Sequence, residues 1–170
     1  LNETEHRNLQ HISTLSRIEE DRFMWLDRFT IRNLELIGSM NENAVTLSDV
    51  LDHTASPMGA RLLKRWIVMP LKDKKSIQER LNIVDYFFKN RDLRDELVGQ
   101  IKQVGDLERL ISKIGLQKAN PREIVQLKRA LYAIEKLKEL TNCKATESLR
   151  TISDQLDACT VIRTRIEEQL

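Results

Sequence analysis

The sequence contains few residues that break helices, with 5 glycines and 3 prolines among its 170 residues. The glycines are scattered singly, so neither GxxxxGK[ST] nor GxGxxG occurs and no nucleotide-binding loop is predicted. Only two cysteines occur, Cys143 and Cys159, which fits a reducing compartment better than a disulfide framework. No apolar run approaches the ~18 residues of a membrane helix, and no charged-then-apolar leader opens the chain. We therefore expect a cytoplasmic protein.

An excess of one charge sign is also lacking. The sequence has 28 basic and 26 acidic residues, a net charge of +2, so its bulk electrostatics do not indicate a nucleic-acid-binding protein. Hydrophobic residues make up 41% of the sequence and charged residues 32%, and Leu, Ile, Lys, Arg and Glu are abundant. Because these residues favour helices, the composition predicts a mostly helical soluble protein of one domain or a tight pair.

Two strong start signals position the predicted helices. Ser56-Pro57 predicts a helix over 57–68, because serine caps free N–H groups, proline suits the first helical position and Pro70 prevents continuation. Asn120-Pro121, with Glu123 placed for a capping box, predicts a helix from 121 to about 140. Gly38 and Gly115 are expected to end two other helices, over 28–37 and from 107. Further N-caps are predicted at Asn2 or Thr4, Asp27, Thr46, Asp73, Asp92 and Asp106.

The predicted fold class is all-α, a bundle of about seven helices that ends in a helical hairpin. At most one short β segment is expected, near residues 22–26, where Phe23-Met24-Trp25-Leu26 predicts a short buried strand or extended segment. One apolar helix face is predicted from Ile77, Leu81, Val84 and Phe88, and another from Leu149, Ile152, Leu156 and Cys159. Residues 1–141 are expected to form a helical core, and 142–170 to begin a helical arm. Because neither end carries a terminal stop signal, we interpret the chain as an excised fragment.

The sequence predicts no catalytic, cofactor-binding or metal-binding residues. His6 and His11 fall on different faces of a predicted helix, and together with His53 and the cysteines they do not form a zinc-type set. The acids of Glu19-Glu20-Asp21 are better explained as a solvated loop than as a cation site. An enzymatic role is therefore the weakest of the functional hypotheses.

The basic residues allow two interpretations. Arg61, Lys64 and Arg65 crowd one predicted helix, whereas Arg28, Arg32 and Arg122 are isolated in the sequence. A phosphate-contacting patch is one interpretation. A solvated or intramolecularly paired face is favoured, because acids are abundant and no aromatic residue lies on the basic face. Asp106 and Glu108 are interpreted as helix-start acids that complement the helix dipole.

Polar residues beside Leu34 and Leu36 predict a structural network. Arg32, Asn33 and Glu35 must find hydrogen-bond partners if they are buried, and such a network is favoured over a catalytic trio. The full set of expected structural or coupling residues is Asp27, Arg32, Asn33, Glu35, Ser56, Pro57, Trp66, Asn120 and Pro121.

Several segments, in order and at natural spacing, resemble the MutS family of DNA mismatch-repair proteins, in its bacterial branch. They are LDRFTIRNLEL at 26–36, DVLDHTASPMGARLLKRWIVMPL at 49–71, ERLNIVDYF at 79–87, GDLERLISKI at 105–114 and NPREIVQLKRAL at 120–131. The resemblance covers most of the chain and is weaker over 1–20 and 142–170. No Walker motif, clamp insertion or mismatch-reading Phe-x-Glu is present, so no catalytic, nucleotide or mismatch residue is transferred to this sequence.

The resemblance implies the core domain of a longer ATP-dependent mismatched-DNA-binding protein. ATP and Mg would bind elsewhere in that parent, which is expected to be a homodimer and to act with MutL-like repair proteins. We hypothesise that the segment couples nucleotide state to clamp opening, and that Trp66→Ala would uncouple them, at a cost of roughly 3–5 kcal/mol if Trp66 is buried. The alternatives are a stand-alone helical protein-interaction module and then a direct DNA-binding domain.

Overall fold

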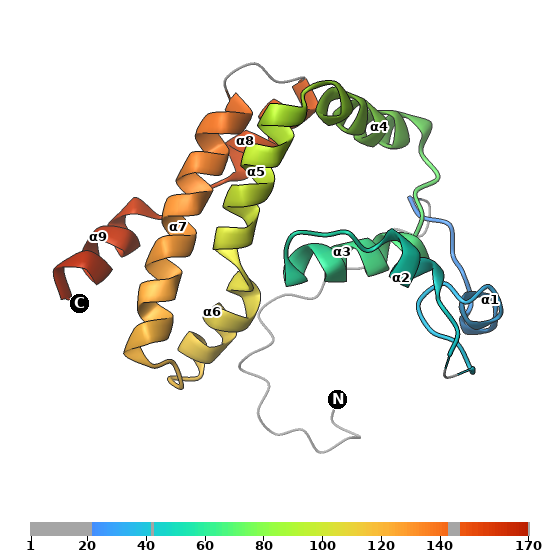
Figure 1. Ribbon diagram of the computed structural model, residues 1–170, viewed down its shortest axis with the longest axis horizontal. Coiled ribbons are helices and arrows are strands. Elements are labelled where there is room, and N and C mark those ends of the chain that lie inside the picture. The colour runs from blue at the N-terminus through green and yellow to red at the C-terminus, as the bar shows by residue number, and fades with distance from the viewer. Residues whose placement is uncertain (1–21, 42, 143–146, 170) are drawn as a thin grey trace.

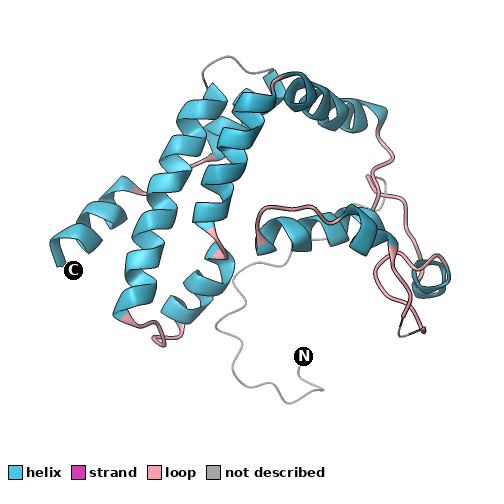
Figure 2. Ribbon diagram, in the orientation of Figure 1, coloured by secondary structure: helices cyan, strands magenta, loops and turns pink. Residues whose placement is uncertain are grey.

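The computed structural model describes residues 22–41, 43–142 and 147–169, and these residues form nine helices (Figures 1 and 2). The helices are α1 (Arg28–Asn33), α2 (Leu47–Leu51), α3 (Pro57–Val68), α4 (Lys74–Lys89), α5 (Arg91–Val104), α6 (Leu107–Gly115), α7 (Pro121–Asn142), α8 (Glu147–Gln155) and α9 (Thr160–Gln169). The all-α fold class is therefore confirmed. The described residues do not include the predicted helix at the start of the chain, His6, His11, Glu19-Glu20-Asp21 or Cys143.

The longest helix, α7, is the centre of the packing. α5 lies beside it along much of its length, and α6, α8 and α9 also contact it (Figure 1). The small residues Ala130 and Ala133 of α7 are buried against Val104 of α5, which lets the two helix backbones approach closely. Other buried apolar side chains of this bundle are Leu97, Leu110, Leu131 and Leu149.

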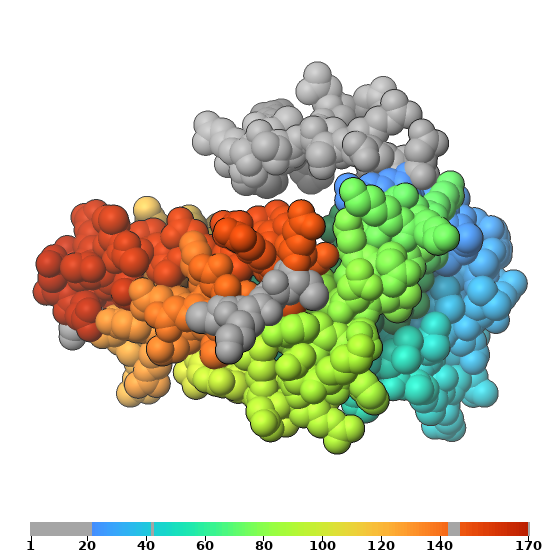
Figure 3. Space-filling model, turned by 90° about the horizontal axis from the view of Figure 1, so that it is seen from above, coloured from blue at the N-terminus to red at the C-terminus, as the bar shows by residue number. Residues whose placement is uncertain are grey.

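The first three helices lie at one side of the molecule, and α4 connects them along the chain to the bundle (Figure 1). In Figure 1, α4 spans the top of the view between the blue-green segment and α5. Seen from above, the residues of α4 and α5 lie between the blue N-terminal surface and the red C-terminal helices (Figure 3).

Most predicted helix starts are confirmed by cap hydrogen bonds. The carboxylates of Asp27 and Asp73 accept from the backbone N–H of Thr30 and Ser76, at 2.8 and 2.7 Å. The Thr46 cap forms a complete capping box with Asp49. The predicted start of α5 is wrong by two residues, since the N-cap is Asn90 rather than Asp92, and Asp92 lies in the first turn of the helix.

The β prediction near 22–26 is correct in kind but wrong about burial. Phe23 forms an isolated antiparallel bridge with Leu71, and the Met24 N–H donates to the Pro70 carbonyl at 2.8 Å. Met24 and Trp25 are exposed. A bridge with one neighbouring segment provides no sheet face on which these side chains could be buried.

Two predicted helix ends are wrong. α1 ends at Asn33 rather than near Ile37, because Glu35, not Gly38, adopts the left-handed conformation (φ 49°). The Leu36 N–H then donates to the Ile31 carbonyl at 3.1 Å, which closes the helix end in a Schellman arrangement. The predicted final helix is divided into α8 and α9, with Cys159 at φ 45° in the break rather than on a continuous apolar face.

Candidate functional site: the contact between α3 and the α5–α7 bundle

The contact of α3 with the bundle begins with the geometry of the helix start. The Ser56 hydroxyl accepts from the Gly59 N–H at 3.2 Å, and Pro57 occupies the first helical position, as predicted. A side chain at Gly59 would lie only 3.3 Å from the Thr54 Cβ. Glycine therefore lets the preceding loop fold tightly over the first turn, and this fixes the direction in which α3 leaves the loop.

Met58, in the first turn of α3, packs against the cluster of Val104, Ala130 and Ala133. This contact brings an apolar side chain from the α1–α3 part of the molecule onto the centre of the α5–α7 bundle. Dispersion and apolar burial therefore act across the junction, in addition to the ionic contacts made one turn later.

Arg61, one turn further along α3, binds two acids at the start of α6. Its guanidinium donates to both carboxylate oxygens of Asp106, at 2.7 and 3.1 Å. It also donates to the Glu108 Oε2 from Nη2 at 2.6 Å and from Nε at 3.0 Å. The planar guanidinium matches such paired oxygen acceptors, so the contact fixes orientation as well as distance.

These contacts hold Asp106 in its ionised form. The hydrogen bonds from Arg61 are the main cause of the lowered pKa of Asp106. As the N-cap of α6, Asp106 also accepts a hydrogen bond from the Arg109 N–H at 3.3 Å, which lowers its pKa further. The same bonds raise the pKa of Arg61. The favoured prediction for the basic face of α3, an intramolecularly paired face, is correct for Arg61. Asp106 and Glu108 have a larger role than the dipole interaction predicted from sequence.

Trp66 connects α3 to α4, but it is not the buried residue considered in the sequence analysis. Its side chain is 41% exposed, and the Arg80 guanidinium of α4 lies 3.7 Å from the ring centroid. This distance places the cation over the aromatic face in a cation–π contact. Desolvation, followed by repulsion from Arg22, lowers the pKa of Arg80.

The predicted residues around α1 divide into two groups. Arg32 and Asn33 are exposed, and Arg32 lies over the Phe29 ring at 5.4 Å. Glu35 accepts from the Ser39 hydroxyl at 2.5 Å, and its carbonyl accepts from the Leu47 N–H at 3.0 Å. The connection between α1 and α2 is therefore made mainly by backbone groups, and the three side chains are not brought together in one network.

Asn120 and Pro121 start α7 as predicted. The Asn120 side chain accepts from the Glu123 N–H at 2.9 Å, and the Glu123 carboxylate accepts from the Asn120 N–H at 3.0 Å. Glu123 also forms an ion pair with Lys113 of α6. The hydrogen bond from Lys113 is the main cause of the lowered pKa of Glu123. The cap therefore also attaches the end of α6 to the start of α7.

Sequence reasoning did not find the partners of Arg61 or the contact of Arg80 with Trp66. Arg61 lies 45 residues from Asp106 and 47 from Glu108, and no local pattern connects residues so far apart. Over residues 22–41, 43–142 and 147–169 the structure shows no group of three or more His, Cys, Asp or Glu side chains arranged to hold a metal. Within the same ranges, no helix combines the length and apolar character needed to cross a membrane.

Comparison with known proteins identifies the family. Residues 29–170 match the family model described as MutS domain III. All 170 residues align with the DNA mismatch repair protein MutS of Parabacteroides distasonis and of Bacteroides fragilis, at 52% identity in each case. The identity to the protein of the same name from Cytophaga hutchinsonii is 48% over 170 residues. The aligned region is 20% of each of these relatives, so the chain spans about a fifth of their length. The chain therefore belongs to the MutS family and corresponds to its domain III.

Proposed function

We propose that this domain couples an ATPase elsewhere in the parent protein to the parts that bind mismatched DNA and clamp the duplex. The contact of α3 with α6 carries this proposal. Arg61 holds Asp106 and Glu108 while Met58 packs on the bundle core, so a displacement of α3 must move α6 and α7 or break these contacts. Packed interiors rearrange in discrete steps, which is what a coupling element between two states requires.

The names of the relatives support the part of this proposal that concerns the parent protein. Each is called a DNA mismatch repair protein, and together with the five matching sequence segments this favours a parent that binds mismatched DNA and uses ATP with Mg. In this proposal nucleotide binding and hydrolysis occur outside the present chain, and no reaction is assigned to domain III. We further infer a homodimeric parent that acts with a MutL-like partner in the cytoplasm.

The proposal is tested with Arg61→Ala in the intact parent protein. The measurements are ATP turnover and the rate at which ATP releases a bound mismatched duplex. We expect the basal ATP turnover to be retained and the ATP-triggered release to slow by about fivefold or more, the lower range of typical coupling between sites. Breaking the α3–α6 contact should have this effect because the ATPase and the DNA-binding parts of the parent then no longer share one two-state element.

Arg65→Ala is the matched control, because Arg65 lies on the same helix and is exposed. This control should release DNA at the wild-type rate. An Arg61→Ala protein that melts at the wild-type temperature and also releases DNA normally would refute the coupling role. It would instead favour the alternative of a helical interaction module.

A further inference from the structure

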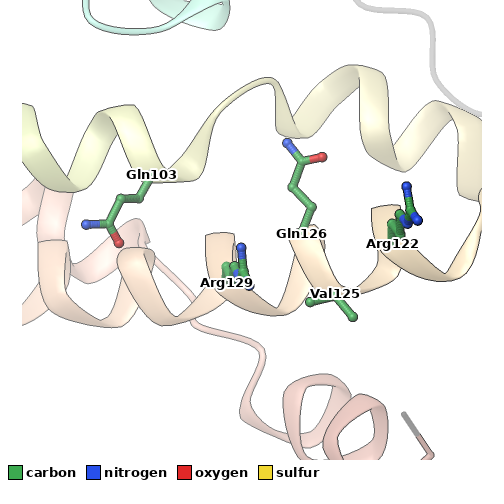
Figure 4. A pocket seen from close by; sticks show the side chains of 5 residues that line it. All are labelled: Gln103, Arg122, Val125, Gln126 and Arg129. Carbon is green, nitrogen blue, oxygen red and sulfur yellow. The ribbon is translucent and has the colours of Figure 1, made fainter.

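A pocket of about 760 Å³ lies between the end of α5 and the first half of α7. Its lining is Gln103, Arg122, Val125, Gln126 and Arg129 (Figure 4). Gln126 extends from α7 towards the α5–α6 junction, and Gln103 extends from α5 towards α7. Arg122 and Arg129 are seven residues apart, so they share one face of α7.

The pocket lies in a basic segment of the chain. Residues 101–130 contain seven basic residues and three acids, an excess of four positive charges, whereas the whole chain has a net charge of +2. The net charge of the sequence therefore hides a local concentration of positive charge. Arg122, expected to be isolated, shares its pocket with Arg129.

All three acids of this segment already have cationic partners. Asp106 and Glu108 bind Arg61, and Glu123 binds Lys113. In the described part of the chain Arg122 and Arg129 form no ion pair or side-chain hydrogen bond, unlike Arg61 and Arg163. Two guanidinium groups therefore line a pocket in which no described residue of this domain supplies a counter-charge.

The two glutamines add neutral hydrogen-bond donors to the same site. Gln126 lies close to Gly105, since a Cβ added at Gly105 would be 3.7 Å from the Gln126 Nε2. Gly105 has φ +65°, a conformation that favours glycine, and it forms the tight turn from α5 into α6. The backbone turn thus sets the wall that Gln126 faces.

We propose that this pocket binds the phosphate backbone of duplex DNA. Arginine and glutamine side chains commonly contact phosphate oxygens, and such contacts position a protein on DNA without reading its sequence. Seven residues at a rise of about 1.5 Å separate the two arginine Cα atoms by about 10 Å along α7. Two cations at this spacing suit the repeating charge of a strand, about 3.4 Å per phosphate along the axis, better than one compact anion. The proposal rests on the proposed function only in that the parent acts on DNA.

The test uses the intact parent protein carrying Arg122→Gln and Arg129→Gln. Binding to matched and mismatched fluorescent duplexes is measured by anisotropy over a series of salt concentrations. The slope of log affinity against log salt should become shallower by about 1 to 2, since each lost phosphate contact contributes about 0.9. The change should be the same for both duplexes, because phosphate contacts carry no sequence information.

The charge-matched control carries Arg150→Gln and Arg165→Gln, two exposed arginines of α8 and α9. This pair removes the same charge and should leave the slope unchanged. A pocket variant whose slope matches the wild type, or is altered no more than that of the control, overturns the proposal. A wild-type parent that binds no duplex at all would overturn the proposed function together with this one.

A second measurement keeps both arginines and does not depend on the stability of a charge variant. A photoreactive side chain is introduced at Val125, which lines the pocket, and irradiation is performed with duplex DNA and ATP both present. Mass spectrometry of the peptide that contains residue 125 should identify attached DNA. Attachment of ATP or of protein instead of DNA, or the absence of any adduct, would overturn the assignment to DNA.

Discussion

Asp106 has two roles at one carboxylate, since it caps α6 and accepts hydrogen bonds from both Nη groups of Arg61. Both interactions require the ionised form and lower the pKa of Asp106. A carboxyl with a lowered folded-state pKa stabilises the fold above its unfolded pKa of about 3.9. This contribution is lost as the pH falls through the lower, folded-state value.

We therefore expect the free energy of unfolding to decrease below about pH 4 by more in the wild type than in Asp106→Asn. Asparagine keeps the N-cap, so this variant isolates the charge. The measurement is urea unfolding at a series of pH values from 7 down to 2. In an Arg61→Gln background the effect of Asp106→Asn should shrink, and an undiminished effect would show that Arg61 is not its cause.

Trp66 is expected to contribute less to stability than a buried tryptophan does. Truncation of a buried tryptophan costs about 3–5 kcal/mol, but this side chain is 41% exposed and is covered on one face by Arg80. We expect Trp66→Ala to cost about 1–3 kcal/mol in urea unfolding. Trp25→Ala is the control: Trp25 is 75% exposed, so its loss should stay within about 0.5 kcal/mol. Equal effects of the two substitutions would contradict the assignment of Trp66 to the α3–α4 contact.

At the scale of one helix, the start of α7 depends on a reciprocal cap. Asn120→Ala removes the acceptor for the Glu123 N–H, and we expect a loss of about 0.5–2 kcal/mol in the free energy of unfolding. Lys118→Ala, in the exposed loop just before the cap, should change stability by less than about 0.5 kcal/mol. Asn120→Asp should recover most of the loss, and failure to do so would argue against a capping role.

The two glycines of α5 and its end should respond in opposite directions to the same substitution. Gly105 has φ +65°, so Gly105→Ala forces an alanine into a strained conformation and should destabilise the fold by about 1–3 kcal/mol. Gly99 lies inside α5 with open space around an added Cβ, so Gly99→Ala should stabilise it by about 0.5–1 kcal/mol. Thermal unfolding of both variants is the test, and effects of the same sign would contradict it.

At the scale of the whole molecule, the apolar face of α4 does not join the core. Ile77, Leu81, Val84 and Phe88 follow one another at helical spacing, yet each is between 37% and 67% exposed. We expect Leu81→Gln with Val84→Gln to change the free energy of unfolding, measured in urea, by no more than about 0.5 kcal/mol per site. Leu97→Gln, at a buried position of α5, is the contrasting control and should destabilise strongly. A similar loss at α4 would mean that this face is buried.

How far the sequence predicted each feature depended on the distance between the interacting residues. The caps at Asp27, Thr46, Ser56, Asp73 and Asn120 were all predicted, because each forms between residues three positions apart. The end of α1 was not predicted correctly, because the left-handed conformation that ends a helix is favoured by glycine, whereas here Glu35 adopts it. There the buried Leu36 and its backbone bond to Ser48 require the chain to turn early.

The sequence by itself determined that the chain is helical, where most of its helices begin and which family it resembles, because these features depend on short segments and on residue order. Only the tertiary structure decided that Arg61 meets acids 45 and 47 residues away, that Arg80 covers Trp66, and that Arg122 and Arg129 line one pocket. It also decided that the apolar face of α4 is exposed. These outcomes depend on which helices pack together, and apolar periodicity identifies a face without specifying what covers it.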